Sequence, residues 1–323
     1  MTKAIRVHTP GGPDSMLWED VPTPEPGPGE ALVRHAAVGL NYIDVYFRTG
    51  LYKAPSLPMT VGMEGAGTVL SVGSGVTDVA VGDRVAYAGA LGAYATERVL
   101  GADKLVKIPE GVDFTTAAAM MLQGMTAQYL LRRTYHVNPG DPIVVHAAAG
   151  GVGLILCQWA KHIGATVIGV VSTAEKAALA KAHGAAHVVV GYGDLVAEVK
   201  RITRGAMVPV VYDSIGKDTF NTSLDCLAPR GLMCCYGAAS GPIPPIDISI
   251  LGAKGSLFLT RPSLATYTAK RSDLVSTAAE LFDVVKSGVV KINVNQTFAL
   301  KNAAAAHIAL ESRKTTGSTV LIP

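Results

Sequence analysis

Residues 142–153 decide the fold of this chain, and they read Pro142-Ile-Val-Val-His-Ala-Ala-Ala-Gly-Gly-Val-Gly153. The apolar run at the start is typical of a buried strand, and the residues after the glycines have the period of a helix up to Ile163. Ala148, Gly150 and Gly153 match the pattern (Gly/Ala)-x-Gly-x-x-Gly. Such a turn lets the backbone approach a pyrophosphate and directs a helix N-terminus at it. The segment therefore predicts a strand–turn–helix unit that binds a dinucleotide.

The same alternation of strand and helix continues through the middle of the chain. Apolar strands that alternate with helices indicate a parallel sheet covered on both faces. We therefore expect a doubly wound α/β domain over residues 137 to about 262. Its further strands are expected at 166–171, 187–190, 208–213 and 231–236, and its further helices at 174–183, 194–203 and 219–227.

The first third of the chain has a different pattern. Short β-type runs separated by turn residues predict a small, mostly antiparallel barrel or sandwich. A long helix is expected over 115–135, with Thr115 or Thr116 as its N-cap. The strands expected near the C-terminus, 297–299 and 318–322, fit this first domain better than the α/β sheet. We divide the chain into one domain of residues 1–123 and 263–323 and a second of residues 124–262.

Composition, charge and sequence pattern argue against a nucleic-acid-binding, secreted or membrane protein. Of the 323 residues, 28 are Lys or Arg and 25 are Asp or Glu, and a net charge of +3 is too small to suggest nucleic-acid binding. The four cysteines form no CxxC pair, and the N-terminus has no signal-peptide pattern, so a cytoplasmic location is expected. Residues 142–160 carry no charge, but they include His146, Gln158 and several glycines. We interpret them as a buried strand and helix, and expect no membrane association.

The end of the second strand of the α/β domain indicates which dinucleotide is bound. A site for NAD places Asp or Glu there to hold the ribose 2′-hydroxyl. This chain has Val171 and Ser172 instead. Ser172 can donate a hydrogen bond to a 2′-phosphate, and Lys176 can neutralise its charge. The sequence therefore favours NADPH.

No ligand set for a catalytic metal is visible in the sequence. Zinc needs three or four N, S or O ligands on converging elements. The β-rich part has no cysteine, and its histidines are His8, His35 and the late His307. We therefore expect hydride transfer that the cofactor performs without a metal.

Motifs along the whole chain form a recognisable set. They are Gly11-Gly-Pro, Gly39-Leu-Asn-Tyr-Ile-Asp44, Gly50-Leu-Tyr52, Gly62-Met-Glu-Gly-Ala-Gly67, Leu91-Gly-Ala-Tyr94, His146–Gly153, Cys157–Lys161, Val211–Ser214, Leu259–Ser263 and Leu310–Arg313. This set resembles the zinc-free quinone oxidoreductases of the ζ-crystallin type, within the medium-chain dehydrogenase/reductase superfamily. The zinc-containing relatives have histidine where this chain has Met63, and cysteine where it has Asn41. The resemblance implies a Rossmann domain that binds NADPH and a GroES-like substrate and catalytic domain.

The resemblance also implies the site residues. Those that line the nicotinamide and substrate site are Asn41, Tyr46, Tyr52 and Thr126. Those that bind or border the cofactor are Asn41, Asp44, Tyr129, Gly150, Gly151, Val152, Gly153, Ser172, Lys176, Tyr192, Ser214, Gly237, Ser240, Phe258, Thr260 and Arg313. Asp44 is expected to orient its segment rather than to transfer a proton.

The implied reaction is transfer of a hydride, or of single electrons, from NADPH to a small quinone. An alternative on the same fold is NADPH-dependent reduction of α,β-unsaturated ketones or aldehydes, which the loops Tyr46–Leu57 and Pro242–Ile250 would decide. A minor alternative of another class is an RNA-binding or structural, crystallin-like role. We expect a homodimer, because the strand around Leu257–Thr260 would be an exposed apolar edge that a second copy can extend.

Overall fold

The computed structural model describes all 323 residues, and the chain divides into two compact units. The first unit comprises Met1–Met125, Thr268–Lys286 and Ile292–Pro323. The second comprises Thr126–Tyr267 and Ser287–Lys291.

The first unit is built on two β-sheets. A seven-stranded sheet has the order β15-β16-β3-β5-β6-β8, with β7 also paired to β3, and a three-stranded sheet has the order β2-β1-β4. The strands are β1 (Thr2–Val7), β2 (Met16–Val21), β3 (Glu30–Leu40), β4 (Met59–Thr60), β5 (Glu64–Val72), β6 (Arg84–Ala88), β7 (Glu97–Gly101), β8 (Val106–Lys107), β15 (Val294–Ala299) and β16 (Ser318–Ile322). All pairings except β15 with β16 are antiparallel, as expected for this part of the chain.

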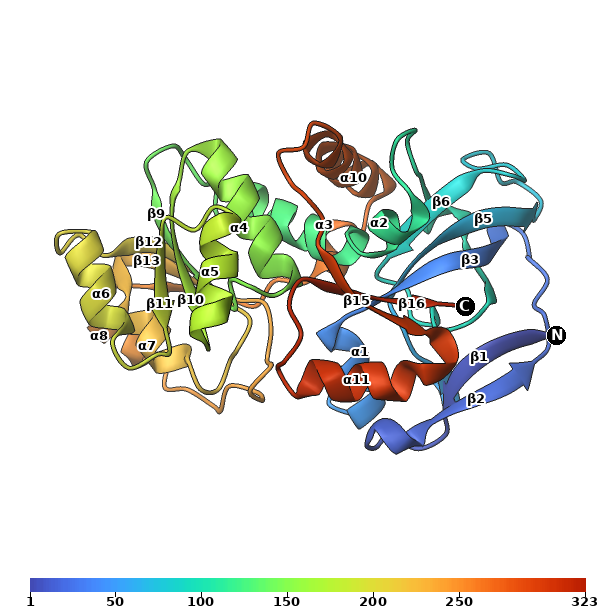
Figure 1. Ribbon diagram of the computed structural model, residues 1–323, viewed down its shortest axis with the longest axis horizontal. Helices are drawn as coiled ribbons and strands as arrows, with labels where there is room; N and C mark the ends of the chain where they lie inside the picture. Colours follow the sequence, from blue (N-terminus) through green and yellow to red (C-terminus); the bar gives the residue numbers. More distant parts are fainter. The chain divides into compact units, whose positions relative to one another are not determined.

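The C-terminal strand returns to the first unit, which confirms the prediction for the end of the chain. Strand β16 pairs antiparallel with β3, from Thr319 opposite Leu40 to Leu321 opposite Val38 (Figure 1). Leu321 is fully buried in the same core as Val33 and Val85. Helices α1 (Tyr42–Thr49), α2 (Phe114–Ala118), α10 (Arg271–Lys286) and α11 (Ala303–Glu311) belong to this unit, and α3 (Met121–Tyr129) begins in it.

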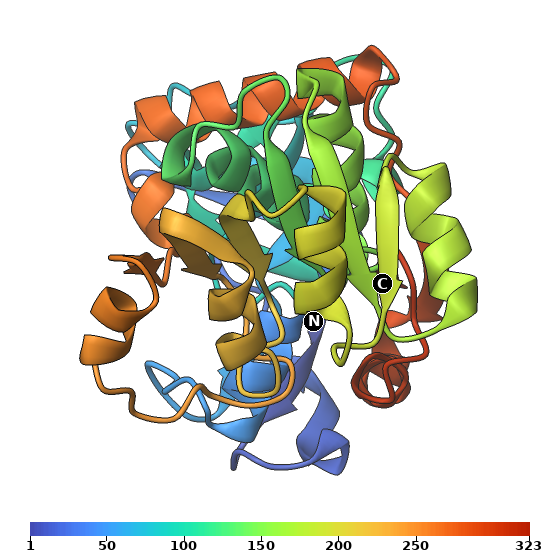
Figure 2. The ribbon, with the colours of Figure 1, turned by 90° about the vertical axis from the view of Figure 1, so that its left-hand side faces the viewer.

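The second unit is a doubly wound parallel sheet with the order β11-β10-β9-β12-β13-β14. Every pairing in it is parallel, and Figure 2 shows the strands side by side with helices covering them. Helices α4 and α5 cover one face, and α6 and α7 cover the other (Figure 1). The elements are β9 (Pro142–His146), α4 (Gly151–Ile163), β10 (Thr166–Val171), α5 (Ala174–Ala182), β11 (His187–Val190), α6 (Leu195–Ile202), β12 (Val208–Asp213), α7 (Phe220–Asp225), β13 (Leu227–Cys235), α8 (Ser249–Ala253), β14 (Phe258–Thr260) and α9 (Leu264–Tyr267).

The single long helix expected over 115–135 is wrong, and so is its N-cap. The N-cap of α2 is Asp113, whose carboxylate accepts the Thr116 N–H at 2.8 Å. A continuous helix would pair the Leu122 N–H with the carbonyl four residues earlier. The Leu122 N–H instead donates to Oε1 of Glu64 at 2.8 Å, and the Ala119 carbonyl accepts from Ser318 at 3.1 Å. These long-range hydrogen bonds separate α2 from α3.

The expected helix is interrupted a second time at its end. Residues Leu130–Thr134 form a wider π-helical turn. The Tyr212 hydroxyl donates to the Leu130 carbonyl at 3.0 Å, which gives this carbonyl a partner outside the helix.

Candidate functional site

The glycine-rich turn of the second unit has the geometry expected for a dinucleotide site. Gly150 is the N-cap of α4, and Gly151, Val152 and Gly153 form its first turn, with their N–H groups outside the hydrogen-bond ladder of the helix. A side chain at Gly153 would overlap the Ala147 carbonyl, so glycine is needed there for the turn to close. A Cβ at Gly150 would meet one protein atom, that same carbonyl oxygen, at 3.3 Å. The turn therefore presents bare backbone and a helix N-terminus at the end of β9.

The end of β10 has polar and positive groups where an NAD site has a carboxylate. Ser172 is exposed directly after the strand, and Thr173 caps α5 by accepting the Lys176 N–H at 3.3 Å. Lys176 lies in the first turn of α5, where the helix dipole also favours an anion. The one acid of this turn, Glu175, is exposed. These residues fit a ribose 2′-phosphate.

The loops after β11, β12 and β13 complete the same edge of the sheet, because all these strands are parallel. Tyr192 follows β11, and its ring lies 5.9 Å from that of His146. Ser214 follows β12 and packs against Gly237, where any Cβ would lie 2.5 Å from the Ser214 carbonyl oxygen. The Ser240 hydroxyl donates to the Ile215 carbonyl at 2.9 Å. The carboxyl edge therefore gathers most of the residues expected to bind the cofactor.

A buried network that the sequence analysis did not assign braces this edge. Asp213 Oδ2 accepts the hydroxyls of Thr219 at 2.7 Å and Ser223 at 2.8 Å, and its Oδ1 accepts the Ile215 N–H at 2.7 Å. Ser223 Oγ also lies 2.9 Å from Nε2 of His146, the last residue of β9. Burial lowers the pKa of His146, and the nearby Asp213 opposes this shift. The network connects the end of β9 to the loop after β12. The sequence feature that could have indicated it is a histidine and an aspartate, each the last residue of an apolar strand.

The remaining residues expected in the second unit lie on α3 and β14. Thr126 and Tyr129 are buried, and the Tyr129 ring stacks on Tyr267 with centroids 4.4 Å apart. Phe258 and Thr260 lie on the edge strand β14, and the Phe258 side chain is 62% exposed.

In the first unit, Asn41 is the N-cap of α1 and is held from two sides. Its Nδ2 donates to Glu64 Oε2 at 2.7 Å, and its Oδ1 accepts from Gln123 at 3.1 Å. Asp44, in the first turn of α1, accepts the Asn41 backbone N–H at 2.9 Å. This contact joins Asp44 to the segment that it is predicted to orient. Glu64 and Gln123 were not assigned roles from the sequence. The feature that could have indicated Glu64 is its position as an acid at the start of an otherwise apolar and glycine-rich strand.

The two buried carboxyl groups of this cluster hold protons more tightly than exposed ones. Burial raises the pKa of Asp44 to about 7, although hydrogen bonds from Asn41 and Tyr94 oppose the shift. Burial raises the pKa of Glu64 to about 8, opposed by the Asn41 and Leu122 hydrogen bonds. Both groups therefore titrate near neutral pH, and the charge of the cluster depends on pH.

The tyrosines of α1 and of the loop after it form an aromatic group. The ring centroids of Tyr46 and Tyr52 are 5.2 Å apart, and Phe47 meets Tyr52 edge-on at 5.8 Å. Arg313 follows α11, with a left-handed backbone (φ 59°), and is exposed. The Tyr42 hydroxyl donates to the carbonyl of Leu310 at 3.2 Å, which connects α1 to the end of α11.

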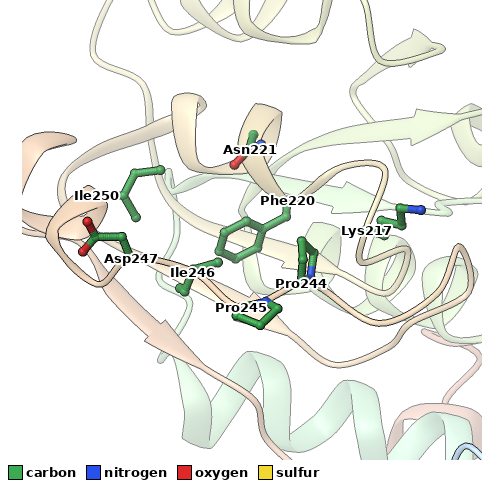
Figure 3. A pocket seen from close by; sticks show the side chains of 8 residues that line it. All are labelled: Lys217, Phe220, Asn221, Pro244, Pro245, Ile246, Asp247 and Ile250. Carbon is green, nitrogen blue, oxygen red and sulfur yellow. The ribbon is translucent and has the colours of Figure 1, made fainter.

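A separate cavity of about 260 Å³ lies within the second unit (Figure 3). Phe220 lies near its middle, with Lys217 toward one end and Asp247 toward the other. The residues that line it are Lys217, Phe220, Asn221, Pro244, Pro245, Ile246, Asp247 and Ile250. Part of this lining belongs to the loop Pro242–Ile250, which the sequence analysis connected with substrate choice.

The chain offers no cluster of three or more His, Cys, Asp or Glu side chains that could hold a metal ion. All four cysteines are buried and unpaired. No helix is both long and apolar enough to cross a membrane.

Comparison with known proteins agrees with this architecture. The model of the alcohol dehydrogenase GroES-like domain matches residues 27–139, and that of the zinc-binding dehydrogenase family matches residues 151–283. The chain therefore has the two-domain fold of the medium-chain dehydrogenases and reductases, with a GroES-like and a Rossmann domain.

Full-length relatives narrow the family. The quinone oxidoreductase of Pseudomonas aeruginosa is 52% identical over 100% of both chains. The crystal structure of Escherichia coli quinone oxidoreductase complexed with NADPH superposes with a TM-score of 0.97, at 48% identity over 100% of both chains. A 2-haloacrylate reductase from Burkholderia sp is 48% identical over 100% of this chain and 99% of its own. The chain belongs to the quinone oxidoreductase family, and it is an oxidoreductase.

Proposed function

We propose that this enzyme reduces small quinones with NADPH and without a metal ion. The observation that carries the proposal is the set of groups at the carboxyl edge of the second unit. The bare turn at Gly150 suits a pyrophosphate, and Ser172, Lys176 and the N-terminus of α5 suit a 2′-phosphate. The NADPH complex of the E. coli relative, at 48% identity, supports the same choice of cofactor.

The two units take different parts in the proposed reaction. The second unit, with the loops after β9 to β13, binds the cofactor, and the first unit provides the substrate groups Asn41, Tyr46 and Tyr52. Bound NADPH supplies a hydride, or electrons one at a time, to the quinone. Two electrons and one proton convert a quinone into a hydroquinone anion, and a second proton from water completes the product.

The side chains of this protein bind and orient the substrate and cofactor rather than acting as acids or bases. The Tyr52 phenol can donate to a quinone oxygen as negative charge develops there, and its ring offers a flat surface to a planar substrate. Asn41 donates one Nδ2 hydrogen to Glu64, and its Oδ1 accepts from Gln123, so its second Nδ2 hydrogen can be donated to the oxygen of a carboxamide or of another carbonyl group. Thr126, Tyr129, Phe258, Thr260 and Arg313 are further proposed contacts of the cofactor or substrate.

A second candidate reaction is reduction of an activated carbon–carbon double bond. The 2-haloacrylate reductase, at 48% identity over the whole chain, favours it. This reaction adds hydride to carbon and needs a proton at the neighbouring carbon.

The test is turnover with three acceptors. Oxidation of NADPH is followed in the nicotinamide absorbance band with 1,4-benzoquinone, a naphthoquinone and a simple enone, and each assay is repeated with NADH. Rapid turnover of the quinones with NADPH, and much slower turnover with NADH or the enone, is expected. Faster turnover of the enone would assign the enzyme to the double-bond reductases, and a preference for NADH would contradict the proposed 2′-phosphate site.

We further propose a homodimer in the cytoplasm. Strand β14 is one of the two edge strands of the six-stranded sheet, and Phe258 and Leu259 on it are 62% and 37% exposed. An apolar open edge can be extended by the same strand of a second copy. The free state of all four cysteines suits a reducing compartment.

A further inference from the structure

A chain of polar side chains runs through the first unit from α11 to the start of α1. Arg48 forms a two-pronged ion pair with Glu311, at 2.8 and 2.9 Å, and its Nη1 lies 3.3 Å from Nδ1 of His307. Nε2 of His307 lies 3.1 Å from the Tyr94 hydroxyl, which lies 3.0 Å from Oδ2 of Asp44. Of these side chains Glu311 alone is exposed.

The direction of every hydrogen bond in this chain follows from Arg48. A guanidinium donates and never accepts, so Nδ1 of His307 must be the acceptor. Burial and the charge of Arg48 lower the pKa of His307 to about 3, so the ring is neutral and carries its proton on Nε2. That N–H donates to the Tyr94 oxygen, and the Tyr94 O–H donates to Asp44. All the donors therefore point toward the Asp44 carboxylate.

A chain with this direction does not conduct protons from the surface. An arginine side chain stays protonated in proteins, so Arg48 blocks the path at its outer end. The hydrogen bonds in series instead polarise one another and favour the ionised form of Asp44. Asp44 in turn holds the backbone N–H of Asn41, whose amide is bonded to Glu64 and Gln123.

We propose that Tyr94 and His307 are positioning residues, which favour the ionised form of Asp44 and so fix the start of α1 and the Asn41 side chain for catalysis. The link to catalysis rests on the proposed function, in which Asn41 contacts the cofactor or substrate.

The charge of Asp44 depends on groups from several elements. Glu64 on β5 and Tyr87 on β6 interact with it unfavourably when charged, whereas Tyr94 donates to it, and the positive charge of Arg48 on α1 acts on Tyr94. Ionised Asp44 is present above its pKa and is lost as the pH falls through it. Loss of the Tyr94 donor raises that pKa further, because this hydrogen bond lowers it. Activity that needs ionised Asp44 then declines at a higher pH than in the wild type.

The chain offers a matched control for Tyr94→Phe. Tyr87 is also a fully buried tyrosine of the first unit, and its hydroxyl lies 2.7 Å from Nε2 of another buried histidine, His35. The hydrogen-bond partners of the Tyr87 hydroxyl are His35 and Arg98, and neither Asn41 nor Asp44 is among them. Tyr87→Phe therefore removes an equivalent buried hydroxyl without breaking the series of hydrogen bonds from Arg48 to Asp44.

Two readouts test the proposal. The first follows the Asp44 carboxyl by ¹³C NMR in the protein without cofactor, with the signal assigned by Asp44→Asn. The second is the pH profile of kcat/KM for a quinone. In Tyr94→Phe the midpoint of the Asp44 titration and the midpoint of the kinetic pH profile are both expected to move upward by about one pH unit. In Tyr87→Phe neither midpoint is expected to move.

Substitutions of His307 test the donor-to-acceptor direction of the hydrogen bonds from Arg48 to Asp44. Glutamine can accept from Arg48 through its oxygen and donate to Tyr94 through its nitrogen, whereas leucine can do neither. His307→Gln is expected to keep the Asp44 midpoint closer to the wild-type value than His307→Leu.

Equal midpoints in Tyr94→Phe, Tyr87→Phe and the wild type would overturn the proposal. An Asp44 titration that moves while the kinetic profile does not would overturn the link to catalysis. A wild-type protein that reduces no quinone would contradict the proposed function, and the NMR titration would still judge the role of Tyr94.

Discussion

Replacement of Gly150 by alanine separates the folding of the glycine-rich turn from its binding of the cofactor. Gly150 has φ −82° and ψ 175°, which alanine adopts readily, and its Cβ would meet just the Ala147 carbonyl oxygen, at 3.3 Å. The stability change is expected to stay below about 1 kcal/mol, since poorer capping is offset by a less flexible unfolded chain. In the proposed site, the added methyl nevertheless lies where the pyrophosphate would approach bare backbone.

The expected loss of affinity follows from the hydrogen bonds at stake. A hydrogen bond to a charged group contributes about 1.5–3 kcal/mol. Loss of one such bond from a backbone N–H to the pyrophosphate raises the Kd for NADPH about 10- to 150-fold. Titration monitored by nicotinamide fluorescence measures the Kd, and thermal unfolding without cofactor measures the Tm.

Gly153→Ala is the contrasting variant. Its Cβ would overlap the backbone of Ala147 and Ala148, so a stability loss of about 1–3 kcal/mol is expected together with weaker binding. If Gly150→Ala binds NADPH within about twofold of the wild type, the pyrophosphate does not contact this turn and the reasoning is refuted.

Three further predictions concern the cofactor, pH and assembly. Lys176→Ala should reduce the preference for NADPH over NADH about tenfold or more, through loss of a charged contact to the 2′-phosphate, and an unchanged ratio of kcat/KM values would contradict that role. The raised pKa of Glu64, about 8, implies that its contribution to stability is present at low pH and is lost as the pH rises toward 8. Glu64→Gln should therefore lessen the fall in unfolding free energy between about pH 6.5 and 8 by about 1–2 kcal/mol in denaturant titrations. If the unfolding free energies of variant and wild type run parallel over this range, Glu64 does not titrate there. Phe258→Asp should convert the proposed dimer into a monomer in sedimentation experiments, whereas Val190→Asp, at an exposed position (52%) on the opposite edge strand β11, should leave the dimer intact. Equal masses for both variants would argue against assembly through β14.

Local pattern was sufficient for most of the second unit. Helix Gly151–Ile163 and strands Thr166–Val171, His187–Val190 and Val208–Asp213 have the bounds expected from the sequence. Apolar runs of strand length and glycines at the turns are local signals, and neighbouring elements reinforce them. The placement of Gly150, Ser172 and Lys176 at one edge followed as well, because the loops after parallel strands share an edge.

The tertiary structure alone decided how the buried polar groups combine. Leu122 breaks a helix that local propensity would continue, because Glu64, 58 residues earlier, accepts its N–H. Tyr94 meets Asp44 across 50 residues and His307 across 213. A sequence shows which polar residues fall within apolar segments, but hydrogen-bond partners so distant along the chain are brought together by packing. For that reason the sequence determined the fold class and the cofactor edge, while the arrangement that holds Asn41 was decided by the folded first unit.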